Sequence, residues 1–195
     1  HHPNPVAAQE YRIPRLWHGD LESSDGKSLM SGDPNGRLYF VITKVVVDPQ
    51  AGEIAAGRLF SGTMKKGEEV FLNMANMPSR VQQVYVYNGA KREIVDNVPA
   101  GNIIGVGGLR AGIPGETVTT EGKAEPFEKI THIFDPVVTK AIEAKKPGDL
   151  PKLIEVLRQV QKEDPTIVID FGIAQVNPEN QKSDTQAWVG LWHKW

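Results

Sequence analysis

Glycine recurs at every fifth position in the stretch GRLFSGTMKKGEEV, residues 57–70. A glycine-rich loop can cradle a phosphate through its backbone N–H groups. The stretch lacks the Gly-Lys-Ser/Thr sequence that closes a phosphate-binding loop, and the residues that follow, EEVFLNM, favour a strand rather than a helix. We therefore predict bends and turns between strands. Gly57 allows a bend or bulge, Gly62 relieves crowding near a strand end, and Gly67 takes the left-handed position of a hairpin turn.

The other residues with chemical potential give weaker patterns. Gly105-Val106-Gly107-Gly108 is similar to part of a dinucleotide-binding fingerprint, but it lacks the GxGxxG spacing and no helix follows, so a bent strand is favoured. The internal histidines do not have the spacing of metal ligands. Ser61 has no evident base beside it. The sequence therefore predicts no catalytic, cofactor-binding or metal-binding residue.

The composition limits the possible partners. The chain has 195 residues and a net charge of -2, and no region is basic enough to hold nucleic acid by charge alone. It contains no cysteine, which excludes disulfides and thiolate zinc sites and suits the reducing cytosol. No apolar run approaches the roughly 18 residues that cross a membrane, and the N-terminus does not have the pattern of a signal peptide.

The elements that would position these residues change along the chain. Residues 1–36 are rich in Pro, Gly, Asp and Ser, and we expect no long regular element there. Short β-prone runs separated by Gly and Pro turns then indicate a barrel or sandwich. The expected strands are residues 38–48, 53–64, 69–74, 80–87, 102–108 and 116–120.

Residues 125–170 have a different pattern, which predicts a β-α-β unit. Apolar residues recur at helical spacing from Leu150 to Val160, Asp149 is the expected N-cap, and Pro165 is expected to end the helix. Residues 171–195 have little periodicity. The sequence leaves open whether this tail is native or foreign, and its residues 187–192 are a candidate substitute strand.

Two long stretches resemble a known family. DPNGRLYFVITKVVVDPQAGEIAAGRLFSGTMKKGEEVFL and RVQQVYVYNGAKREIVDNVPAGNIIGVGGLRAGIPGETV are similar to the second domain of translation elongation factor 2, the archaeal and eukaryotic translocation GTPase. PNPVAAQEYRIPRLWHGD looks like the connector from the GTPase (G) domain of that family. FDPVVTKAIEAKKPGDLPKLIEVLRQVQKEDPTIVI looks like the first half of its third domain. The resemblance covers about residues 3–170 and ends there.

The resemblance implies a fold that is mainly β plus α+β: a translation-factor-type β-barrel followed by a partial ferredoxin-like β-α-β unit. The implied domains are a connector over residues 1–36, the barrel over 37–124, the partial third domain over 125–170 and the divergent tail over 171–195. The phosphate loop and the Asn-Lys-x-Asp motif of the G domain do not occur in the sequence. We therefore expect no GTP hydrolysis by this chain, with GTP and magnesium held by a G domain outside it.

The resemblance also implies a function in protein synthesis. The chain is expected to be a non-catalytic, cytoplasmic fragment that docks on small-subunit rRNA of the ribosome and relays the GTP state of the G domain, with no membrane contact. The residues implied to face rRNA are Arg58, Lys65, Lys66 and Arg80, and those implied to pack on the G domain are Tyr11, Ile13, Leu16 and Trp17. The alternatives are a fragment of a related ribosome-assembly or spliceosomal GTPase, a stand-alone RNA- or protein-binding barrel, and an enzyme with an unrecognised site.

Overall fold

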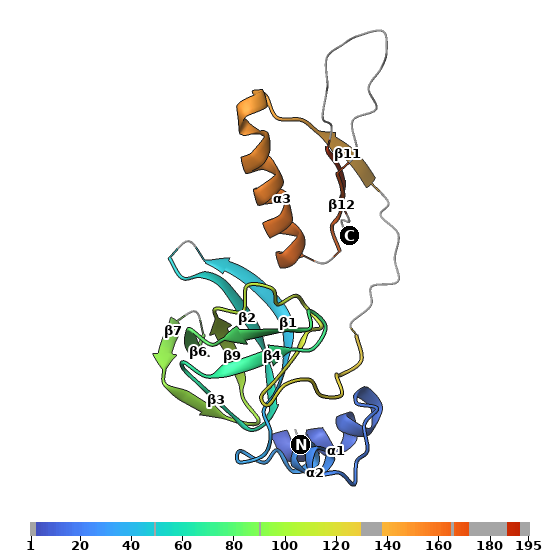
Figure 1. Ribbon diagram of the computed structural model, residues 1–195, viewed down its shortest axis with the longest axis vertical. Coiled ribbons are helices and arrows are strands. Elements are labelled where there is room, and N and C mark those ends of the chain that lie inside the picture. Colours follow the sequence, from blue (N-terminus) through green and yellow to red (C-terminus); the bar gives the residue numbers. More distant parts are fainter. Residues whose placement is uncertain are drawn as a thin grey trace. The chain divides into compact units, whose positions relative to one another are not determined.

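The computed structural model describes residues 3–48, 50–89, 91–129, 138–164, 166–171 and 187–191. The chain divides into two compact units, His1–Ile130 and Thr131–Trp195 (Figure 1). The first unit includes the predicted connector and barrel, and the second includes the predicted β-α-β region. Within the described ranges, no helix is both long and apolar enough to cross a membrane.

The N-terminal segment is helical, and the expectation of no long regular element there was wrong. Helix α1 spans Pro5–Leu16 and helix α2 spans Ser24–Ser31. Figure 1 shows the two helices beside each other at one end of the barrel. The prolines are tolerated because Pro5 lies in the first turn of α1 and Pro14 in its last turn. The side chain of Asn4 caps α1 by accepting from the Ala7 N–H at 2.8 Å.

The barrel is built from antiparallel strands. The larger sheet has eight strands in the order β5-β4-β10-β1-β2-β9-β6-β7, and a smaller sheet pairs β3 with β8. The strands are β1 Tyr39–Asp48, β2 Gly52–Ser61, β3 Thr63–Lys65, β4 Glu69–Leu72, β5 Met77–Arg80, β6 Gln83–Asn88, β7 Lys91–Val95, β8 Asn97–Pro99, β9 Ile103–Gly107 and β10 Thr117–Thr119.

The segment between β5 and β6 joins two parts of the large sheet. The Val81 N–H donates to the Glu68 carbonyl beside β4, and the Gln82 N–H donates to the Gly107 carbonyl of β9, each at 2.9 Å. These bonds link the β5 end of the sheet to strands near its other end, so the sheet curls around one core. The predicted β-barrel fold class is confirmed.

Most of the predicted strands are present, with several differences. The predicted run 53–64 is split at Gly62 into β2 and β3. The predicted run 80–87 is split between β5 and β6, because Val81 and Gln82 make the connection described above. Strands β7 and β8 were not predicted. Strand β7 carries charged residues and β8 ends in a proline, so neither has the apolar alternation that marks a strand in sequence.

The glycines have the predicted structural roles. Gly57 pairs with Ile42, next to a register shift that leaves Thr43 as an extra residue in β1. A Cβ on Gly57 would lie only 1.9 Å from the Val41 carbonyl oxygen, so the close approach of β1 excludes any side chain there. Gly67 has φ 81° in the turn between β3 and β4, and Gly62 lies between β2 and β3.

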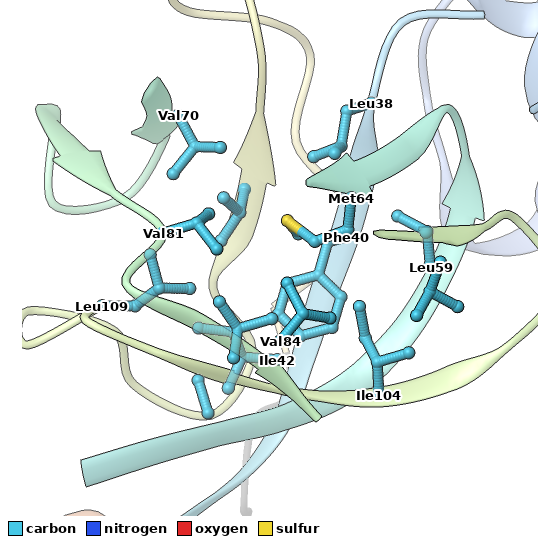
Figure 2. Close-up of a cluster of buried hydrophobic side chains, with 14 of the residues drawn as sticks. Leu38, Phe40, Ile42, Leu59, Met64, Val70, Val81, Val84, Ile104 and Leu109 are labelled. Atoms are coloured by element: carbon cyan, nitrogen blue, oxygen red, sulfur yellow. The ribbon is translucent and has the colours of Figure 1, made fainter. Parts of the chain in front are cut away.

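The barrel interior is a single apolar core (Figure 2). Phe40 and Ile42 of β1 are fully buried and point into it with Met64, Val84 and Ile104. Each such side chain contributes roughly 1.5–3 kcal/mol by leaving water. On the outward face of β1 and β2, Tyr39, Val41 and Phe60 form a second buried cluster with residues of α1 and α2.

The second unit pairs one helix with a three-stranded sheet. Its elements are β11 Val138–Ile142, the 3-10 turn Pro147–Asp149, α3 Leu150–Glu163, β12 Val168–Asp170 and β13 Ala187–Leu191. The sheet order is β11-β13-β12 with both pairings antiparallel, so β11 and β12 run parallel on either side of β13. This is the split β-α-β arrangement of a ferredoxin-like unit, and the candidate tail strand is present as its central strand.

Helix α3 follows the predicted apolar spacing. Leu157 is buried, and Leu153 and Val160 pack with it against Ile167 and Ile169. Asp149 occupies the N-cap position, but its backbone is helical and its side chain accepts no capping hydrogen bond. The reason is that a 3-10 turn precedes α3 and already directs the chain into the helix. Pro165 lies outside the described residues.

Candidate nucleic-acid interface

Arg58 of β2 lies against the first turn of α1. Its Nη2 donates to the Pro5 carbonyl at 3.4 Å, and its guanidinium carbon lies 5.4 Å from the centre of the Phe60 ring. The side chain is half-buried, and its Nε–H is buried with no hydrogen-bond partner among the described residues. Such an orphan donor costs free energy unless a further acceptor arrives.

Arg12 of α1 provides a second positive charge at the same place. Burial lowers the pKa of Arg58, and the charge of Arg12 lowers it further. Among the described residues, the ion pairs join Lys27 to Glu22, Arg37 to Asp25 and Arg92 to Asp48, and none involves Arg12 or Arg58. Two arginines that repel each other without a carboxylate between them form a place where an anion is stabilised.

The neighbour of Arg58 on β9 is apolar and exposed. Ile103 lies opposite Arg58 in the β2–β9 register and has 68% of its surface in contact with solvent. We call Arg12, Arg58 and Ile103 the arginine face. It combines charge for a phosphate with apolar surface for a sugar or base edge.

The remaining predicted rRNA residues meet at one turn. Lys65 and Lys66 are exposed at the turn from β3 to β4. Arg80, on β5, is exposed and donates from Nε to the Gly67 carbonyl of that turn at 3.0 Å. The structure therefore brings Lys65, Lys66 and Arg80 together, although they are separate in sequence.

Acidic side chains surround this turn and reduce its attraction for phosphate. The Glu68 carboxylate accepts from the Lys65 N–H at 3.2 Å, and Glu69 lies opposite Arg80 in the β4–β5 register. Lys65 also lines a polar groove of about 860 Å³ beside α2. The charged residues of that groove are Asp25, Arg37, Lys65, Glu68, Glu69 and Glu121, which gives it more negative than positive charge. The arginine face is thus the better place for an anion.

The predicted packing residues of α1 divide into two groups. Tyr11 and Leu16 are exposed, at 64% and 38%. Ile13 and Trp17 are 0% and 4% exposed, so they cannot form an outward docking surface, and this part of the expectation is corrected. Ile13 lies on the face of α1 that packs against the barrel, and Trp17, the extended residue that caps the end of α1, packs in the same buried cluster.

Tyr11 has an exposed ring that contacts a neighbour on α1. The guanidinium carbon of Arg15 lies 3.7 Å from the centre of the Tyr11 ring. This contact orders both side chains on the outer face of the helix. Arg12 also belongs to α1, so the helix supplies charge and aromatic surface to one side of the unit.

Sequence reasoning missed Arg12. Nothing in its local sequence distinguishes it, because its role depends on Arg58, which reaches it only through the packing of α1 on the barrel. Ser61, a weak candidate nucleophile, is fully buried and its hydroxyl donates to the Arg37 carbonyl. In the described part of the chain, no three or more His, Asp or Glu side chains cluster in a way that could hold a metal ion.

Comparison with known proteins gives one consistent relationship. Residues 52–119 match the family model described as elongation factor Tu domain 2. The chain is 54% identical over 172 residues to elongation factor 2 of Methanopyrus kandleri, a match covering 88% of this chain. It is 53% identical over 167 residues, or 86% of this chain, to elongation factor 2 of Thermococcus gammatolerans. The same protein of Halomicrobium mukohataei is 54% identical over 171 residues, or 88% of this chain.

The relatives are much longer than this chain. The match covers 14% of the Methanopyrus kandleri protein and 23% of the proteins from Thermococcus gammatolerans and Halomicrobium mukohataei. The chain therefore spans less than a quarter of the length of these curated relatives, and most of their sequence has no counterpart in it.

Proposed function

This chain corresponds to a segment of elongation factor 2 that includes the second domain, and on that premise we propose that it is a docking part of a ribosomal translocation factor. In this proposal the barrel binds rRNA of the small ribosomal subunit in the cytoplasm. The second unit is part of the third domain and relays the GTP state of the G domain. The chain performs no chemistry itself.

The arginine face is the observation that carries the docking proposal. The positive charge of Arg12 acts on Arg58, neither arginine has an ion-pair partner within the described structure, and the buried Arg58 Nε–H has no acceptor there. An RNA phosphate would supply the missing negative charge beside the half-buried Arg58 guanidinium and the exposed Arg12. With a net charge of -2, the chain as a whole does not attract RNA, so binding depends on such a local site.

The nucleotide belongs to a different part of the parent protein. We propose that GTP and magnesium are held by the G domain that precedes α1, and that this chain binds neither. The exposed Tyr11 and Leu16 of α1 lie close to where such a domain would join the chain, and we propose them as its contacts.

Binding to purified archaeal small ribosomal subunits tests the docking proposal. The chain is sedimented with the subunits over a series of salt concentrations, with Arg12→Gln as the main variant because Arg12 is exposed and its loss leaves the core intact. We expect saturable binding by the unaltered chain. Loss of one phosphate contact is expected to reduce the slope of log affinity against log salt by about 1.

Lys123→Gln is the matched control, because Lys123 is an exposed cation outside the arginine face. This variant is expected to retain the affinity and the salt slope of the unaltered chain to within a factor of about two. The proposal is wrong if the unaltered chain does not bind the subunits at low salt, or if Arg12→Gln and Lys123→Gln weaken binding equally.

A further inference from the structure

Helix α1 contacts the segment by which the chain leaves the barrel. The Trp17 indole N–H donates to the Glu125 carbonyl at 2.8 Å, and the Glu128 N–H donates to the Leu16 carbonyl at 2.9 Å. Trp17 and Phe127 form an isolated antiparallel bridge. We call residues 124–128 the exit segment, since they follow the last barrel strand and precede the second unit.

Aromatic rings pack around the contact between the end of α1 and the exit segment. Phe127 stacks on Phe60 with 4.7 Å between ring centres, and the Tyr39 ring meets both Trp17 and Phe127 edge-on at 6.2 and 6.3 Å. Trp17 and Phe127 are 4% and 5% exposed. Ring packing of this kind excludes water from the backbone hydrogen bonds and strengthens them.

A buried amide helps to fix α1 to the rest of the unit. Gln9 is fully buried, and its Nε2 donates to the carbonyls of Leu29 in α2 and Phe60 in β2, the latter at 2.9 Å. Its Oε1 has no partner among the described residues. Among the described residues Gln9 makes no direct hydrogen bond to the exit segment, and it reaches that segment through α1 and through Phe60, whose ring stacks on Phe127.

We propose that α1 and the exit segment form one mechanical element, the exit clamp, which transmits any displacement of α1 directly to the chain that leads into the second unit. The exit segment is also bonded to the barrel, because the Phe127 N–H donates to the Thr117 hydroxyl of β10 at 3.0 Å, so the clamp is a second link beside this one. The exit clamp rests on the proposed function in one respect, because that function identifies the G domain as the part that would move α1. The clamp itself depends on contacts within the first unit.

Hydrogen exchange of single amides in the complete 195-residue chain tests the clamp. The decisive variant is Gln9→Leu, which removes both bonds from Gln9 to the barrel and α2 but keeps a side chain of similar size. If α1 and the exit segment move together, the Glu128 amide exchanges about tenfold faster in this variant, because its acceptor is the Leu16 carbonyl of α1.

Two further variants separate the clamp from a general loss of stability. Trp17→Phe keeps an aromatic ring but removes the donor to Glu125, and it is expected to raise exchange at Glu128 to a similar extent. Tyr11→Phe changes an exposed ring on the same helix and is expected to leave Glu128 unchanged. The Ile42 amide, which donates to the Glu116 carbonyl in the barrel, reports global unfolding in every sample.

The clamp is confirmed if Glu128 exchange rises in both Gln9→Leu and Trp17→Phe while Ile42 stays constant. It is overturned if Gln9→Leu speeds exchange within α1 but leaves Glu128 protected, since the exit segment is then held by the barrel alone. Equal increases at Glu128 and Ile42 also overturn it. Because no ribosome is present in this experiment, a failure of the docking proposal cannot be confused with a failure of the clamp.

Discussion

Replacing Gly57 by alanine is expected to destabilise the barrel strongly. The new Cβ would lie 1.9 Å from the Val41 carbonyl oxygen and 2.8 Å from its carbon, whereas ordinary contacts begin at 3.4 Å. Strands β1 and β2 would therefore have to separate by roughly 1.5 Å at this point. The neighbour is backbone, which cannot rotate away as a flexible side chain would.

The size of the effect follows from this geometry. Overpacking in a rigid core costs about 1–3 kcal/mol, and a clash with a paired backbone belongs at or above the upper end of that range. A loss of about 3 kcal/mol lowers the melting temperature of a unit of this size by roughly 10 °C. Thermal unfolding followed by circular dichroism measures the change.

Gly107→Ala is the matched control for this experiment. Gly107 lies on β9, next to β2, and a Cβ there would meet the Tyr85 ring at 3.5 Å, an ordinary contact. We expect a change within about 1 kcal/mol of the unaltered chain. If Gly57→Ala melts within 2 °C of Gly107→Ala, on the order of 0.5 kcal/mol, the strand approach at Gly57 does not limit the barrel and our reasoning fails.

Two further predictions concern a surface charge and the second unit. The pKa of Asp48 is lowered because its carboxylate accepts from the Ala51 and Gln50 N–H groups and pairs with Arg92. The ionised Asp48 carboxylate therefore stabilises the fold above its ordinary pKa of 3.8, and this stabilisation is lost as pH falls through the lower pKa of the folded state. Asp48→Asn should make the measured free energy of unfolding depend less on pH in that acidic range. Ending the chain at residue 186 removes the central strand β13 and leaves β11 and β12 unpaired, so amide NMR signals from α3 should lose dispersion while those from the barrel stay in place.

Local patterns in the sequence were sufficient for much of the fold. The glycine spacing from Gly57 to Gly67 predicted turns rather than a phosphate loop, because φ and strand crowding depend on near neighbours. The apolar period from Leu150 to Val160 predicted α3 for the same reason. Strands β7 and β8 were missed because short edge strands have little apolar alternation.

The candidate sites were less accessible to such reasoning. Lys65, Lys66 and Arg80 could be named as basic residues, but their meeting at one turn follows from the β4–β5 pairing. Ile13 and Trp17 could be named as apolar residues, but the sequence does not say whether they face the chain's own barrel or another domain. The aromatic cluster around Tyr39 decides that they face the barrel.

The sequence by itself determined most of the longer barrel strands, helix α3, the turns at glycine, and the relationship to elongation factor 2, because these depend on residue type and short-range spacing. Only the tertiary structure decided that Arg58 reaches α1 at the Pro5 carbonyl, that Trp17 holds the exit segment, and that β13 lies between β11 and β12. Each of these contacts joins residues far apart along the chain. Their pairing is selected by the packing of whole elements, which minimises exposed apolar surface and which no local pattern records.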